Sequence, residues 1–144
     1  MGYSNQSRSG QVLPDAFATV LLSGVTDNLR LFRIMGAITV LRVGFNITTA
    51  PTTTSPVVDW DRRILTGSDT GRIDKGVTVM TFPAVALCPI GSIIYKNVTV
   101  DLNPGDEVSV QVTTAAAAGA GFPFLEYVPR DETPANFADM VAAA

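Results

Sequence analysis

Histidine is absent from this chain of 144 residues, and cysteine occurs once. Histidine is the commonest general base in enzymes and the commonest metal ligand, so its absence removes the usual parts of a catalytic or metal site. Cys88 stands between Leu87 and Pro89 in an apolar run and has no partner for a disulfide within the chain. We therefore expect a buried, inert thiol, because a nucleophilic cysteine needs a nearby histidine.

Charge is also sparse: charged residues make up 16% of the chain, and the net charge is −3. The basic residues of the first half and the middle are scattered, without interleaved aromatics: Arg30, Arg33, Arg42, Arg62, Arg63, Arg72 and Lys75. Binding to nucleic acid needs many phosphate contacts, which this distribution does not supply. Sparse surface charge is typical of proteins that work inside an assembly.

Long apolar runs are missing too. None approaches the roughly 18 residues that cross a bilayer, and the polar start, MGYSNQSRSG, leads into no apolar segment of a secretion signal. We expect no membrane span. The polar composition of residues 1–11 predicts a flexible N-terminal arm. Residues 12–130 are expected to form one β-sandwich domain, and residues 131–144 a tail with a short helix, because Thr133 suits an N-cap and Pro134 the first helical position.

The chain does contain residue patterns typical of β-strands and turns. Val108, Val110 and Val112 alternate with polar residues, which predicts a strand with one buried and one wet face. The preceding residues Asn103-Pro104-Gly105-Asp106 predict a type II turn, since proline presets φ and glycine accepts the positive φ of the third position. Together they indicate a hairpin.

Similar patterns recur along the chain. We expect strands at 17–22, 29–35, 37–48 (the longest), 57–65, 77–87, 93–95, 98–102, 107–114 and 124–128. Loops are expected at 48–56, rich in Pro and Thr, at 67–71, and at the small-residue segment 115–121, interpreted as a crossover. Seven to nine short strands with frequent turns predict an all-β protein, an antiparallel β-sandwich of jelly-roll-like type.

Candidate sites are few. The acidic residues Asp59, Asp61, Asp69 and Asp74 match no calcium-loop spacing, so a solvated loop is the better interpretation. A glycosidase pair would have to come from Asp101, Asp106, Glu107 and Glu126, and nothing in the sequence marks two of them as buried. We expect no catalytic residue, no metal and no cofactor.

Aromatic and apolar residues are the remaining candidates. Trp60, Phe122, Phe124 and Tyr127 could form a platform for a sugar, but core or interface anchors are the favoured interpretation. The residues assigned to an interface are Val12, Leu13, Phe17, Trp60, Phe122, Phe124, Tyr127 and Phe137.

Three segments of the chain resemble a known family. They are the polar arm leading into VLPDAFATVLLS, the paired segment LRLFRIMGAITVLRVGFNIT, and the stretch YKNVTVDLNPGDEVSVQVTTAAAAGAGFPFLEYVP. The chain resembles small bacteriophage head-decoration (cement) proteins of the β-sandwich type and, more loosely, other virion β-sandwich proteins. The resemblance implies a non-enzymatic protein, made in the host cytoplasm, that binds the major capsid protein on the outer face of the virion. It also implies a homo-oligomer, with a trimer favoured from capsid symmetry and a dimer as the alternative.

Two other interpretations stay open. One is a carbohydrate-binding or receptor-binding module of a virion fibre or spike, for which Trp60 or Tyr127 should be exposed on a face or loop. The other is a hydrolase, which requires two acidic side chains within about 10 Å of each other in a cleft.

Overall fold

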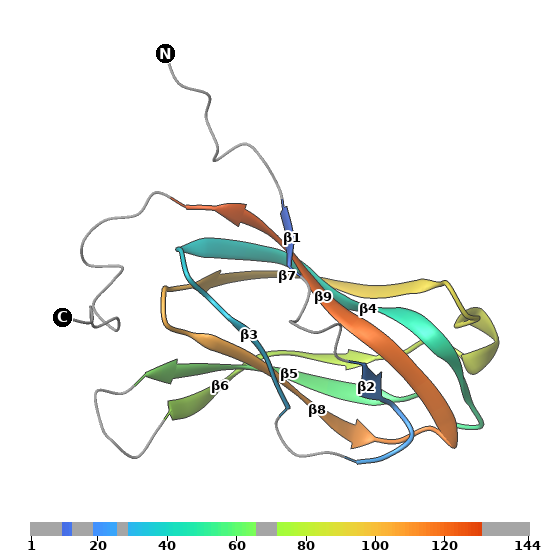
Figure 1. The fold of residues 1–144 in the computed structure, drawn as a ribbon. Coiled ribbons are helices and arrows are strands. Elements are labelled where there is room, and N and C mark those ends of the chain that lie inside the picture. Colours follow the sequence, from blue (N-terminus) through green and yellow to red (C-terminus); the bar gives the residue numbers. More distant parts are fainter. Residues whose placement is uncertain (1–9, 13–18, 26–28, 66–71, 131–144) are drawn as a thin grey trace.

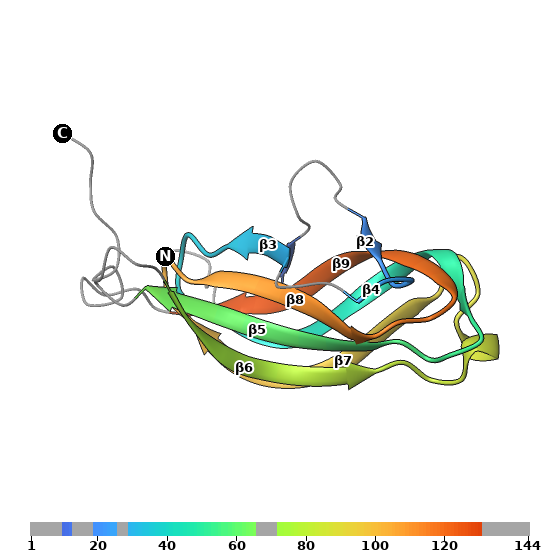
Figure 2. The same cartoon turned by 90° about the horizontal axis from the view of Figure 1, so that it is seen from below.

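The computed structural model describes residues 10–12, 19–25, 29–65 and 72–130 of the chain. They form two antiparallel sheets stacked as layers (Figures 1 and 2). Sheet A contains β1 (Gly10–Val12), β2 (Val20–Leu21), β4 (Ile38–Thr52), β7 (Ile93–Leu102) and β9 (Ala118–Pro129). Sheet B contains β3 (Leu29–Arg33), β5 (Val57–Leu65), β6 (Arg72–Thr81) and β8 (Glu107–Thr114). A short 3₁₀ turn, η3 (Val85–Leu87), lies between β6 and β7.

The order of the strands defines the architecture. Sheet A runs β1-β9-β4-β7, and β2 also pairs with β9, so β1 and β2 share one edge of that strand. Sheet B runs β3-β8-β5-β6. If β1 and β2 count as one interrupted strand, successive strands alternate between the layers except for the β5–β6 hairpin, which lies within sheet B. This is the strand order of a double Greek key. The sequence-based prediction of an antiparallel, jelly-roll-like β-sandwich is therefore confirmed.

The core lies between the two sheets and is built from alternate residues of each strand. At its centre the Phe45 ring lies 5.5 Å from the Trp60 ring and 5.7 Å from the Phe82 ring, measured between centroids. Val108, Val110 and Val112 are all buried there, as their alternation predicted. Within the described ranges no helix is both long and apolar enough to span a bilayer.

The Pro104-Gly105 turn forms as predicted but has a different role. Gly105 has φ +92°, and the Asp106 N–H donates to the Asn103 carbonyl across 3.1 Å, which is the geometry of a type II turn. The predicted hairpin is wrong, however, because β7 pairs with β4 whereas β8 pairs with β3 and β5. The turn carries the chain from one sheet to the other, as a jelly roll requires at this point.

The wet face expected for β8 is also only partly right. Thr113 is exposed, but Ser109 and Glu107 are buried although they point away from the core. Arg33 covers part of this face, since its Nη2 donates to Glu107 Oε1 across 2.7 Å.

Several boundaries differ from expectation because pairing between strands overrides local turn propensity. β4 is the longest strand, as predicted, but it continues through Pro51 to Thr52, in the segment expected to be a loop. Its last residues pair with Ala118 and Ala120 of β9 across register shifts, where an irregular ladder tolerates proline. β9 consequently begins at Ala118, inside the expected crossover, and only the preceding residues connect the two sheets.

Other elements are shorter or longer than predicted. β7 is one continuous strand where two were expected, and β6 ends at Thr81, ahead of Pro83. Gly10 and Gln11, assigned by sequence to the arm, lie in β1. The rest of the arm, the turn at 67–71 and the tail at 131–144 with its expected helix lie outside the described residues.

Candidate interaction surface

The residues that sequence reasoning assigned to an interface occupy different environments in the structure. Trp60 is fully buried in the core, so its assignment to an interface or to a sugar platform is corrected. Tyr127 is half-buried and packs against the core, whereas Phe122 is half-buried on the opposite side of β9. Val12 is a residue of β1. Phe124 is buried, and the other three lie outside the described residues: Leu13, Phe17 and Phe137.

The outer face of sheet A, which points away from the core, is built from three rows across β9, β4 and β7. Neighbours in register place the following residues side by side: Phe122, Asn46 and Ile93 in one row, Phe124, Gly44 and Tyr95 in the next, and Glu126, Arg42 and Asn97 in the third. These residues alternate with core residues such as Leu125 and Phe45. Because side chains alternate along a strand, all three rows face outward.

Large apolar side chains are exposed on this face. Ile93 is 59% exposed and Tyr95 is 52% exposed, both on β7. Leu21 of β2 is exposed on the same side, since its neighbours Val20 and Leu22 belong to the core. We call these residues, together with Phe122, the sheet A patch. Sequence reasoning missed Ile93 and Tyr95 because β7 is apolar at alternate and adjacent positions, so its pattern does not show which face is buried.

Gly44 lies in the middle row of this face, and its lack of a side chain leaves room for the Phe124 ring. A Cβ on Gly44 would stand 2.7 Å from Cζ and 2.8 Å from Cε1 of Phe124, so the ring occupies the space that a side chain would take. Phe124 itself is only 1% exposed. Its assignment to an interface is therefore corrected.

Polar groups border the patch along the third row. The Arg42 guanidinium lies 4.6 Å from the centroid of the Tyr95 ring, a cation–π geometry. Arg42 Nε also donates to Asn97 Oδ1 across 3.2 Å, and its Nη1 lies 3.4 Å from Glu126 Oε2. These contacts hold the Tyr95 ring in place and set a charged edge beside an apolar surface, the arrangement typical of protein interfaces.

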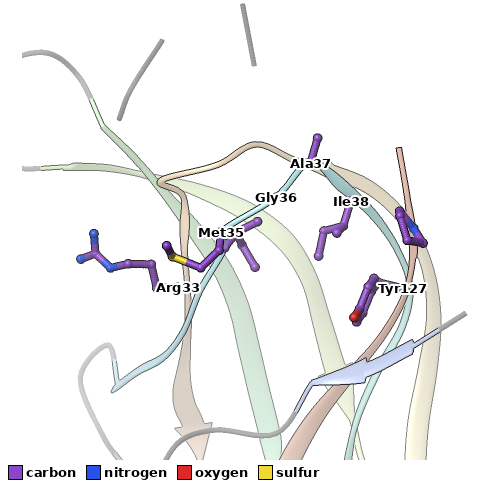
Figure 3. Close-up of a pocket in the computed structure, with 8 residues that line it drawn as sticks. Arg33, Met35, Gly36, Ala37, Ile38 and Tyr127 are labelled. Atoms are coloured by element: carbon purple, nitrogen blue, oxygen red, sulfur yellow. The ribbon is translucent and has the colours of Figure 1, made fainter. Parts of the chain in front are cut away.

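A pocket of about 370 Å³ opens at one end of the sandwich (Figure 3). It lies between the segment that joins β3 to β4 and the last residues of β9, and its lining is mostly apolar: Arg33, Ile34, Met35, Gly36, Ala37, Ile38, Tyr127 and Pro129. Ile34, Ala37 and Ile38 are buried, whereas Met35 is 65% exposed at the rim. The Arg33 side chain is 58% exposed beside it.

The Pro104-Gly105 turn fixes the shape of this pocket. The Ile34 N–H donates to the Asp106 carbonyl across 2.9 Å, and the Gly105 N–H donates to the Ile34 carbonyl across 2.8 Å. On the other side, the Arg130 N–H donates to the Ala37 carbonyl across 3.0 Å. Both walls are therefore held by backbone hydrogen bonds, so the pocket belongs to the fold and is not made by a mobile side chain.

The carboxylates considered for catalysis are each engaged separately. Asp101 Oδ1 accepts from Thr39 Oγ1 across 2.6 Å, and Asp106 Oδ2 accepts from the Asn103 N–H across 2.9 Å. The other two, Glu107 and Glu126, form the ion pairs with arginine described above. Among the described residues no three histidine, cysteine or acidic side chains are grouped as metal ligands.

The single cysteine is buried, as predicted. Burial raises the pKa of the Cys88 thiol above its ordinary value, because the charged thiolate loses hydration. A raised pKa keeps the thiol protonated near neutral pH, which is the opposite of what a nucleophile needs.

Comparisons with known proteins add little to this description. No protein-family model and no curated protein matches the chain. Among solved structures, the chain is similar to the Eiger TNF from S. frugiperda, with 11% identity and a TM-score of 0.40 over 88% of this chain and 95% of that one. It is also similar to the structure of the infectious bursal disease virus Gx strain, with 10% identity and a TM-score of 0.39 over 90% of this chain and 35% of that one. The assignment to the jelly-roll class rests on the order of its own strands.

Proposed function

We propose that this protein is a structural component of a virus particle, a decoration protein that binds the outer surface of a phage head. Its role is to stabilise the head through contacts across neighbouring coat subunits, and it carries out no chemical step. The observation that carries the proposal is the sheet A patch: a sandwich that has already closed its own core still exposes Ile93 and Tyr95 on one sheet face. Exposed apolar patches of this kind mark sites of protein interaction.

The form of the patch suits attachment to a large, regular surface. β4 and β9 are hydrogen-bonded on both sides, and the edge strand β7, which carries Ile93 and Tyr95, is paired with β4 along its length. The backbone of the face is therefore ordered and loses little conformational entropy on binding. The bordering pair Arg42 and Glu126 supplies charge of both signs at its edge. On a repeating lattice many copies bind at once, and multivalency converts modest single contacts into firm retention.

Binding to undecorated heads tests the proposal directly. We expect the purified protein to bind them stoichiometrically and the variant Ile93→Asp to bind about 30-fold more weakly, because an unpaired carboxylate in a dry interface costs on the order of 2 kcal/mol. The matched control is Val79→Asp on the outer face of sheet B, where Val79 is 51% exposed against 59% for Ile93. This control should bind like the unsubstituted protein.

Each contrary outcome has a separate meaning. Equal binding of the two variants would show that the sheet A patch is not the attachment surface. Failure of the unsubstituted protein to bind any head would remove the decoration function. A glycan array serves as the competing test, because a specific hit that depends on Tyr95 would favour a carbohydrate-binding module of a fibre or spike. The core position of Trp60 removes one of the two residues, Trp60 and Tyr127, on which that alternative relied.

A further inference from the structure

The loop between β6 and β7, residues 82–92, exposes apolar side chains at one end of the sandwich, where the short coil of η3 lies at the right of Figures 1 and 2. Every exposed side chain of this loop is apolar: Pro83, Ala84, Ala86, Leu87, Pro89 and Ile90. Leu87 is 65% exposed, and Ile90, at 71%, is the most exposed large apolar side chain of the described residues. Neighbouring exposed apolar side chains of this kind mark a contact surface.

This end of the sandwich also lacks charge. Three segments that meet here contain no charged residue: 43–58 with the β4–β5 connection, 77–95 with the loop itself, and 112–125 with the β8–β9 connection. The charged residues of these strands begin only at Asp59, Lys96 and Glu126. The loop therefore offers no ion pair to a partner, and it can enter a water-free environment without burying a charge.

The polar groups of the loop are directed to its own carbonyls. Ser92 is its only residue with a hydroxyl, and this hydroxyl donates to the Pro89 carbonyl across 2.6 Å. The Ser55 hydroxyl, from the β4–β5 connection, donates to the Pro83 carbonyl across 3.0 Å. The two prolines have no N–H to satisfy, and the Cys88 thiol is buried. These groups are paired within the protein, so they need neither water nor a hydrogen-bonding partner.

Backbone contacts with β4 hold the loop in this form. The Gly91 N–H donates to the Ile47 carbonyl across 2.8 Å, and the Ile47 N–H donates to the Ser92 carbonyl across 2.9 Å. Cys88 lies beneath the loop as part of the core cluster. Because the backbone is already fixed, Leu87 and Ile90 are presented to a partner at little further cost in conformational entropy.

We propose that this loop inserts into the surface of a neutral lipid bilayer, with Leu87 and Ile90 in contact with the acyl chains. The bilayer interior accepts apolar side chains, whereas charges and unpaired polar groups are costly there, and the loop is free of charge and has its hydroxyls paired. A protein partner matches this chemistry less well, because protein interfaces carry about one hydrogen bond per 100–200 Å² and a polar rim.

The contact is peripheral, since the loop is far too short to span a bilayer. Two side chains bury less apolar surface than a myristoyl chain, which itself binds membranes reversibly. A single copy should therefore bind weakly, and a particle that displays many copies should bind firmly. This lipid contact goes beyond the proposed attachment to heads and does not depend on it.

Flotation of the full chain with vesicles of phosphatidylcholine alone, at millimolar lipid, tests the proposal. We expect the unsubstituted protein to float with the vesicles. Leu87→Gln and Ile90→Gln should each bind about tenfold more weakly, which corresponds to about 1.4 kcal/mol. The matched control is Met35→Gln at the pocket, because Met35 and Leu87 are both 65% exposed. This control should bind like the unsubstituted protein.

A dye on the loop gives a second readout. Ala86→Cys carries an environment-sensitive fluorophore, and the buried Cys88 does not compete for it. Its emission should shift to shorter wavelength when vesicles are added, whereas the same dye on Met35→Cys should not respond. Both effects should persist at about 1 M salt, where charged contacts are screened beyond about 3 Å, because the loop contains no charge.

Three outcomes would overturn the proposal. The first is no flotation of the unsubstituted protein, or equal flotation of Leu87→Gln and Met35→Gln. The second is binding that requires anionic lipid and disappears in salt, which would indicate a charged surface elsewhere. The third is a dye shift without vesicles, together with an oligomer that Leu87→Gln dissociates, which would make the loop a protein contact. Heads enter none of these measurements, so their failure would leave the proposed attachment through the sheet A patch standing.

Discussion

The substitution Gly44→Ala should destabilise this protein far more than one added methyl group suggests. Gly44 lies in the middle of β4, with β7 on one side and β9 on the other. An added Cβ would collide with the backbone carbonyl oxygen of Ile94 and would stand 2.7 Å from Cζ of Phe124. Neither neighbour can yield easily, because the carbonyl belongs to a paired strand and the ring is buried.

The magnitude follows from what must move. Overpacking a filled site costs about 1–3 kcal/mol. Complete loss of the Phe124 ring from its site sets a ceiling of about 3–5 kcal/mol, the usual cost of truncating a buried phenylalanine. Burial of the new methyl returns less than about 1 kcal/mol. We therefore expect a net loss of about 2 kcal/mol, which for a domain of this size lowers Tm by roughly 4–8 °C.

Urea unfolding measures this effect cleanly. Trp60 is the only tryptophan and is fully buried, so its fluorescence reports the loss of the core. The matched control is Gly76→Ala in β6, where a Cβ would meet no atom within 4 Å. That substitution should leave stability unchanged or raise it by up to about 1 kcal/mol, because alanine restricts the unfolded chain. If Gly44→Ala unfolds at the same urea concentration as Gly76→Ala, the close fit of Phe124 over β4 is refuted.

Two further predictions concern buried polar groups. Because burial raises the pKa of Cys88, the unfolded chain releases the thiol proton at a lower pH than the folded one. The free energy of unfolding should therefore fall as pH rises from about 8 to about 10. The fall should be steeper than in the variant Cys88→Ala, which has no thiol. Parallel pH profiles of the urea midpoints for the two proteins would contradict this. Asp106→Ala removes the acceptor of the Asn103 N–H and should cost about 1–3 kcal/mol, whereas Asp106→Asn retains an oxygen and should recover most of it. Equal midpoints for these two variants would show that the acceptor is not the source of the stability.

Local chemistry alone was enough to predict the class of this fold and the position of most of its strands, but not all of their bounds. The alternation of Val108, Val110 and Val112 placed them in the core, and Pro104-Gly105 specified its turn, because both depend on backbone geometry within a few residues. The absence of histidine and the apolar setting of Cys88 likewise pointed to a buried thiol before any contact was known.

Which side chains lie on the surface was harder to predict, and β7 shows why. A two-residue period shows which side chains share a face, but it identifies the buried face only when the other is polar. β7 carries Ile93 and Tyr95 on one face and Ile94, Val98 and Val100 on the other, so its sequence leaves the choice open. Only packing against the second sheet turned the latter group toward the core and left the former exposed.

The sequence by itself determined that the chain would form antiparallel strands around one core, since propensity, period and turn residues act locally. The tertiary structure alone decided which strands pair, and it thereby made the Pro104-Gly105 turn a bridge between sheets that shapes the pocket. It also placed Trp60 inside and Tyr95 outside. Those outcomes depend on contacts between residues far apart in the chain, and no local pattern encodes them.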